Sequence, residues 1–177
     1  MGWIVGGLLI ATAIVGGALA VWARESNGVG WAIVQLVLIA AAGALVPLGQ
    51  RPSPGWSIPL AICTVLAATF GGGIVVKVVL RLAGHPQAIV DDLPASAWIG
   101  MVERFAMTFA LVLGQAAIAA VIIAVKALGT YSPGGTGGAG GTGNRVASVR
   151  VLGTLTSVTW ALLCYGVIAV ARARMVP

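Results

Sequence analysis

The chain has 177 residues, of which 59% are apolar and only 8% are charged, and its mean hydropathy is +1.06. Soluble domains carry about 25% charged residues, so this composition excludes an ordinary water-soluble protein and indicates a chain built for lipid. Ten Lys and Arg residues against four Asp and Glu residues give a formal net charge of +6. Because these basic residues are spread along the whole chain, they fit contacts with anionic lipid better than a nucleic-acid surface.

Uncharged apolar runs follow one another along the chain, at residues 3–22, 31–49, 58–76, 105–125 and 151–171. A helix needs roughly 20 apolar residues to cross a hydrocarbon core of about 30 Å. The sequence therefore predicts an all-α, polytopic membrane protein, a bundle of five transmembrane helices in a single domain of residues 1–177. We expect the spans at about residues 3–22, 31–49, 58–80, 100–127 and 151–171.

Tryptophans and glycines add detail to the first three runs. Most tryptophans lie at or near run ends, where amphipathic rings prefer the membrane interface; these are Trp3, Trp22, Trp31, Trp56 and Trp98. In an assembly subunit, a small-residue face of the first run is expected to bind another membrane protein or a second copy; it consists of Gly6, Gly7, Gly16 and Gly17. If the chain is a transporter, Gly71, Gly72 and Gly73 of the third run are expected to loosen that helix near its cytoplasmic end.

The connections before and after the fourth run have distinct compositions. Pro94 predicts the start of a short interfacial helix that leads into the fourth span, because proline suits the first turn of a helix. Residues 132–144 are rich in glycine and predict a flexible linker. An odd number of spans places the two ends of the chain on opposite membrane sides. A small excess of Lys and Arg on one side predicts an outside N-terminus and a cytoplasmic C-terminus.

The fourth span carries a polar stripe. At 3.6 residues per turn, its strongly polar side chains other than Glu103 share one helix face, which is formed by Arg104, Thr108, Gln115 and Lys126. In a straight helix Arg104 and Lys126 lie about 33 Å apart, so we expect the two cations at opposite membrane faces and Gln115 midway. An amide without partners is costly in lipid, so the stripe is expected to face other helices or a cavity.

Glu103 needs a cation other than its neighbour, because adjacent residues of a helix point in different directions. Its predicted partners are Arg81, Arg172 and Arg174, which are expected on the same membrane side. In the fifth span Thr154 and Ser157 belong to a seam of small residues against which the fourth helix can pack. We expect Gln115 to bond to a hydroxyl of this seam.

Over about residues 98–170 the chain resembles the C-terminal half of a family of bacterial integral-membrane proteins of unknown function. The shared pattern is Gly-x-x-Glu-Arg, a central Gly-Gln, a Lys at the end of the helix, and Gly-Thr-Leu-x-Ser. Here it is formed by Gly100, Glu103, Arg104, Gly114, Gln115, Lys126, Gly153, Thr154, Leu155 and Ser157. The family usually has Arg-Phe after the Lys and an acidic residue before Gly-Thr, whereas this chain has the glycine linker, Arg145 and Arg150. The resemblance implies a shared membrane hairpin and no particular activity.

Two interpretations of the polar stripe remain open. In the first the stripe is structural, with Gln115 holding helices together, and the protein is a non-catalytic structural or assembly subunit of a membrane complex. In the second the chain is a small oligomeric transporter or channel, in which Arg104, Gln115 and Lys126 line a site for a polar or anionic solute, joined by Gln35 of the second span. We expect the first.

Catalysis has little support. His85 is the single histidine, and the adjacent Asp91 and Asp92 project in different directions, so no converging acid and base are expected. Cys63 and Cys164 lie within apolar runs and are expected to pack as small hydrophobic side chains. We therefore expect no enzyme activity, no cofactor and no metal site. The expected location is the bacterial cell (inner) membrane, with lipid and a second copy or another membrane protein as partners, and no nucleic acid.

Overall fold

The structure is a computed structural model that describes residues 2–22, 28–48, 54–84, 94–131 and 142–174. These residues form six α-helices and a 3-10 turn, and no strand occurs among them. The elements are α1 (Gly2–Trp22), α2 (Gly28–Leu48), η1 (Pro54–Trp56), α3 (Ser57–Leu82), α5 (Pro94–Val112), α6 (Ala116–Tyr131) and α7 (Thr142–Ala173). The predicted all-α class is confirmed.

Three helical segments are long and apolar enough to cross a membrane. They are Gly28–Leu48, Ser57–Leu82 and Val149–Ala173, and two shorter apolar segments are Trp3–Ala18 and Ala116–Leu128. The five-span bundle is therefore not confirmed. Of the predicted glycine linker, residues 132–141 lie outside the described part of the chain, and residues 142–144 belong to α7.

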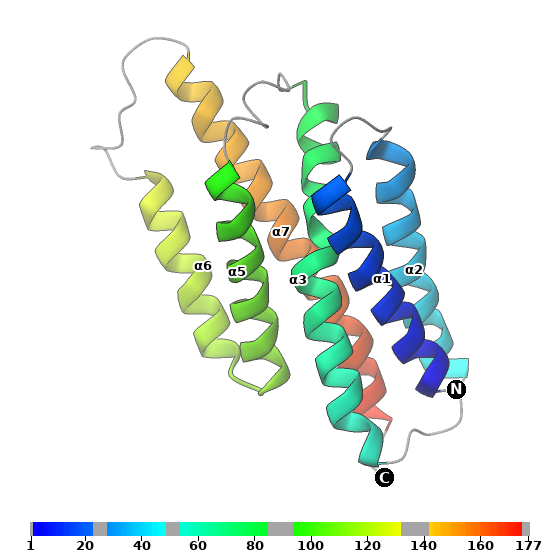
Figure 1. Ribbon diagram of the computed structural model, residues 1–177. Helices are drawn as coiled ribbons and strands as arrows, with labels where there is room; N and C mark the ends of the chain where they lie inside the picture. The colour runs from blue at the N-terminus through cyan, green and yellow to red at the C-terminus, as the bar shows by residue number, and fades with distance from the viewer. Residues whose placement is uncertain (1, 23–27, 49–53, 85–93, 132–141, 175–177) are drawn as a thin grey trace.

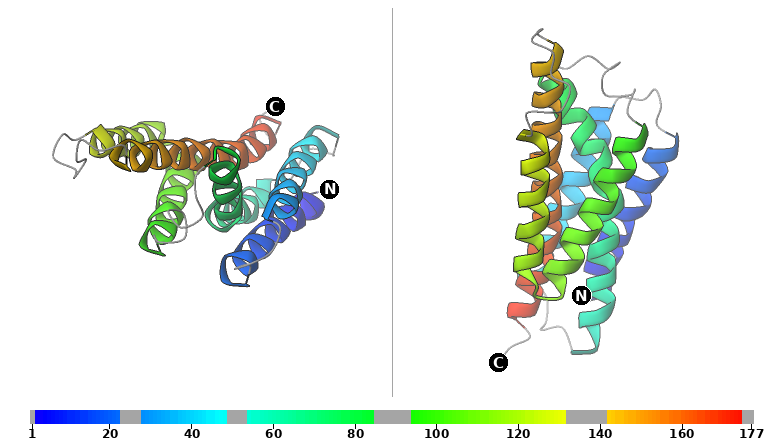
Figure 2. Two further views of the ribbon diagram at one scale, coloured as in Figure 1. Left: turned by 90° about the horizontal axis from the view of Figure 1, so that it is seen from above. Right: turned by 90° about the vertical axis from the view of Figure 1, so that its left-hand side faces the viewer.

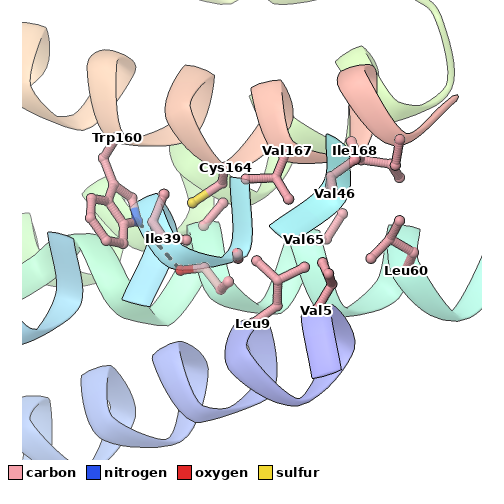
Figure 3. Close-up of a cluster of buried hydrophobic side chains, with 14 of the residues drawn as sticks. Val5, Leu9, Ile39, Val46, Leu60, Val65, Trp160, Cys164, Val167 and Ile168 are labelled. Atoms are coloured by element: carbon pink, nitrogen blue, oxygen red, sulfur yellow. Dashed lines mark hydrogen bonds between the residues drawn. The ribbon is translucent and has the colours of Figure 1, made fainter. Parts of the chain in front are cut away.

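Helix α3 forms the centre of the bundle, because it packs against α1, α2, α5 and α7 (Figures 1 and 2). Helix α6 lies at one edge and packs mainly against α5, with a smaller contact to α7 (Figure 1). The main apolar core lies where α1, α2, α3 and α7 meet. Figure 3 shows Trp160 of α7, the largest fully buried side chain among the described residues, in this core beside Ile39 and Cys164.

The predicted fourth span, residues 100–127, is wrong as a single helix. One helix, α5, begins at Pro94 without a separate interfacial helix and ends at Val112, and α6 begins at Ala116. Gly114 lies between them with φ at 78°, a conformation that glycine adopts without steric cost. The amide of Gln115 donates to the Ala110 carbonyl (2.8 Å) and that of Gly114 to the Leu111 carbonyl (3.0 Å). This pair of hydrogen bonds is a Schellman motif, which terminates a helix.

The hairpin changes the predicted path of the chain. The six helices of the described residues run alternately up and down, and the start of α1 and the end of α7 lie at the same end of the bundle (Figure 1). The predicted opposite membrane sides for the two ends depend on five spans, a number that is not confirmed, and they stay a prediction.

Two arginines near the end of α7 reach the ends of other helices. Arg172 donates through Nη1 to the carbonyl of Val112, the last residue of α5. Arg174 donates through Nη1 to the carbonyl of Val46 near the end of α2 (2.7 Å). The last carbonyls of a helix lack partners within it, and cations bind there favourably. The ends of α2, α5 and α7 therefore lie at one level.

Candidate functional site: a buried polar layer

Arg104 of α5 is a buried cation that joins three helices. Only 4% of its surface is exposed. Its Nε and Nη2 both donate to the carbonyl of Thr69 in α3 (3.3 Å each), and its Nη1 donates to the Ser157 hydroxyl in α7 (3.2 Å). Because a guanidinium presents several donors in a planar fork, one side chain can bond to α3 and α7 at once.

Two glycines of α3 make room for this layer. A Cβ on Gly72 would lie 2.6 Å from Trp160 Cδ1 and 3.0 Å from Arg104 Cδ. A Cβ on Gly71 would lie 2.7 Å from Trp160 Cζ2 and 3.0 Å from Thr12 Cγ2. Helix α3 is continuous from Ser57 to Leu82, and the predicted loosening by Gly71, Gly72 and Gly73 stays a prediction. The missing side chains of Gly71 and Gly72 let α1, α5 and α7 approach α3 closely.

A second polar group lies on the α1 and α2 side of Gly71. Gln35 of α2 is fully buried, and its Nε2 donates to the Thr12 carbonyl of α1 (3.1 Å). Its Oε1 has no hydrogen-bond partner among the described residues and lies 3.3 Å from the position of a Gly71 Cβ. On the α7 side, the Trp160 indole N–H donates to the Ala67 carbonyl (3.3 Å; Figure 3). Polar contacts thus connect α3 to α7, and α1 to α2.

Glu103 pairs with Lys126 across the hairpin. The Lys126 ammonium donates to Oε2 of Glu103, and the side chains of Lys126 and Glu103 are 29% and 24% exposed, respectively. The predicted partners Arg81, Arg172 and Arg174 are therefore wrong for the ion pair that the structure records. Arg172 and Arg174 instead bond to backbone carbonyls. The physical reason is the turn at Gly114, which folds α6 back along α5 and brings Lys126 beside Glu103.

The turn also divides the predicted polar stripe. Arg104 and Thr108 remain on the buried face of α5, where Thr108 is fully buried and its Oγ1 has no hydrogen-bond partner in the described part of the chain. Gln115 is exposed at the turn, so the prediction of a mid-membrane amide bonded to the seam is wrong. Lys126 lies on α6, where it pairs with Glu103, the neighbour of Arg104 in α5. The prediction that Arg104 and Lys126 lie at opposite membrane faces is therefore wrong.

Thr154 and Ser157 of the predicted seam face the α5–α6 hairpin. The Thr154 hydroxyl donates to the Arg150 carbonyl within α7 (2.8 Å). Both residues line a small pocket between α5, α6 and α7, together with Glu103, Arg104, Met107, Ile122, Ile123, Lys126 and Val158. The centre of a water molecule can occupy about 20 Å³ of this pocket. This volume is enough for about one water.

Sequence reasoning missed the central role of Trp160 and of the Thr69 carbonyl. A signal for Trp160 was present, since it is the one tryptophan in the middle of an apolar run. The acceptor at Thr69 belongs to the main chain, so no side-chain pattern could indicate it. Among the residues that the structure describes, no three His, Cys, Asp or Glu side chains lie close enough together to hold a metal ion.

The chain matches no protein-family model, no curated protein and no solved structure.

Proposed function

We propose that this chain is a non-catalytic integral membrane protein of the bacterial cell membrane that serves as a structural or assembly subunit of a membrane complex. The observation that supports this role best is that the charged side chains of the hairpin bond within the chain. Arg104 bonds to Thr69 and Ser157, and Lys126 bonds to Glu103. The pocket beside them has room for about one water, which favours a packing role over a solute path.

We propose further that α5 and α6 cross the membrane as a hairpin. Their 19 and 16 residues correspond to lengths of about 28 Å and 24 Å, close to the hydrocarbon thickness of about 30 Å.

Isolation of the tagged protein from native membranes in mild detergent tests the subunit role. A stoichiometric partner or a defined homo-oligomer is the expected result, with an unrelated membrane protein that carries the same tag as the control. A monodisperse monomer without a partner would contradict the proposal.

The second candidate is a small oligomeric transporter or channel for a polar or anionic solute. It is favoured by the partial exposure of Glu103 and Lys126, since charges within a membrane commonly mark solute or ion paths. In reconstituted vesicles, Lys126→Ala should then abolish uptake, whereas Gln115→Leu at the exposed turn should leave it unchanged. Equal transport by wild type and Lys126→Ala would exclude this candidate.

A further inference from the structure

The Glu103–Lys126 pair lies near the middle of the hairpin. Glu103 precedes the end of α5 at Val112 by about 14 Å, and Lys126 follows the start of α6 at Ala116 by about 15 Å. Val112 lies at the level of the α7 end, because Arg172 bonds to its carbonyl. With α5 and α6 crossing the membrane as proposed above, the ion pair lies close to the centre of a bilayer of ordinary thickness.

Partial exposure of the Glu103–Lys126 ion pair to lipid at this depth is energetically unfavourable. About a quarter of the Glu103 side chain and 29% of the Lys126 side chain are exposed in the single chain. Charged groups at this depth almost always face the interior of a bundle or water, because exposure to hydrocarbon is unfavourable. The neighbouring pocket has room for about one water only. Helix α6 forms the edge of the bundle, so none of the described helices of the same chain lies beyond it (Figure 2).

The charges of this patch indicate what covers it. The patch consists of Glu103, Lys126 and the adjacent pocket residues Ile123 and Thr154. It carries one negative and one positive group side by side, surrounded by apolar and hydroxyl side chains. Such a patch is complementary to itself after rotation by 180°, which is the condition for a twofold symmetric interface.

We propose that a second copy of this chain covers this patch, with Glu103 of each copy facing Lys126 of the other. The four charges then alternate in sign, and the ion pairs are removed from lipid. This inference rests on the proposed subunit function and names the partner as an identical chain.

Charge reversal in one or both copies tests the interface. Glu103→Lys gives a chain with two cations in the patch, and Lys126→Glu gives a chain with two acids. Each variant alone should lose dimers by about tenfold or more, because like charges then meet across the interface. When the two variants carry different tags and are produced together, they should copurify as a mixed dimer at close to the wild-type level.

The double variant Glu103→Lys with Lys126→Glu is the control for folding. It retains one acid and one base in each chain, so it should dimerise with itself like the wild type. Failure of the two single variants to recover dimers together, while the double variant dimerises, would overturn the twofold arrangement.

Disulfide cross-linking tests the same interface with Glu103 and Lys126 both unchanged. In a Cys63→Ala, Cys164→Ala background, Ile123→Cys in the patch should form cross-linked dimers in membranes. Ile33→Cys, on the exposed side of α2, is the matched control and should not. Cross-links at position 33 alone, or capture of a different protein by the patch, would refute the second copy while leaving the subunit function intact. A monomer that captures nothing would refute both.

Discussion

At the scale of single residues, Arg104 is held by neutral acceptors. Its guanidinium bonds to one carbonyl and one hydroxyl, and both belong to other helices. A buried charged donor that loses its acceptor costs more than a neutral one. The hydroxyl of Ser157 is therefore expected to matter more for stability than hydroxyls that bond within their own helix.

Ser157→Ala should lower the free energy of unfolding by about 1–3 kcal/mol, since Nη1 of Arg104 loses its acceptor. Thr156→Val is the matched control, because the Thr156 hydroxyl bonds to the Leu152 carbonyl of the same helix. That control should change stability by about 1 kcal/mol or less. Denaturant titration in mild detergent measures both, and equal losses would show that the Arg104 contact is not important.

Neighbouring glycines of α3 provide a second test at this scale. Gly72→Ala should destabilise the protein by about 1–3 kcal/mol, because the new methyl group would overlap Trp160 and Arg104. A Cβ on Gly73 has no atom within 4 Å. Gly73→Ala should therefore stabilise the protein slightly, by about 0.5–1 kcal/mol, through helix propensity. Melting temperatures of the two variants that fall on the same side of wild type would contradict this assignment.

At the scale of elements, the sequence was informative wherever an apolar run ends in polar residues. The ranges predicted at 3–22, 31–49 and 58–80 coincide closely with α1, α2 and α3, and residues 151–171 lie within α7. The exception is residues 100–127. The turn there contains Gly114 and Gln115 but no charged residue, and a single amide is also found within membrane helices, so the pattern of the two apolar stretches predicts one helix. Gly114 was the available signal, but isolated glycines also occur within membrane helices.

The turn has a direct accessibility test. In the cysteine-free background, Gln115→Cys should react with a membrane-impermeant maleimide supplied on both sides of the membrane. The turn lies at the level of the α7 end, which the proposed crossing of α5 and α6 places near the membrane surface. Thr108→Cys, at a fully buried position of the same hairpin, is the control and should not react in intact membranes. A single continuous helix would place residue 115 at the bilayer centre, so a Gln115→Cys variant that does not react would support that alternative.

The partner of Glu103 depends on whether residues 100–127 form one helix or two. Arg81, Arg172 and Arg174 were reasonable partners for a straight helix, whereas a hairpin brings a residue of α6 beside Glu103 instead. The sequence did identify residues that lie together, since Arg104, Glu103 and Lys126 all line one pocket. Their contacts depended on a turn that the sequence did not reveal.

At the scale of the whole molecule, the even number of described helices predicts the course of the chain. The start of α1 and the end of α7 lie at the same end of the bundle (Figure 1). If all six helices cross the membrane, reporter proteins fused before α1 and after α7 should be on the same side.

Alkaline phosphatase and green fluorescent protein fusions measure this in cells, because the first is active outside and the second fluoresces inside. The same reporter should be functional at both ends. Fusions after Ala83 or Leu48 are matched controls, since they follow α3 and α2 at opposite ends of the bundle. Opposite results for the two ends of the chain would favour an odd number of crossings.

The arginines at the end of α7 have a consequence for the order of assembly. A chain is synthesised from its N-terminus, so α2 and α5 leave the ribosome before Arg172 and Arg174 are made. Until then the carbonyls of Val46 and Val112 lack the guanidinium groups that bind them in the finished bundle. The arginines at the end of α7 thus bind the ends of two earlier helices, and a nascent chain acquires these bonds only once α7 is in place.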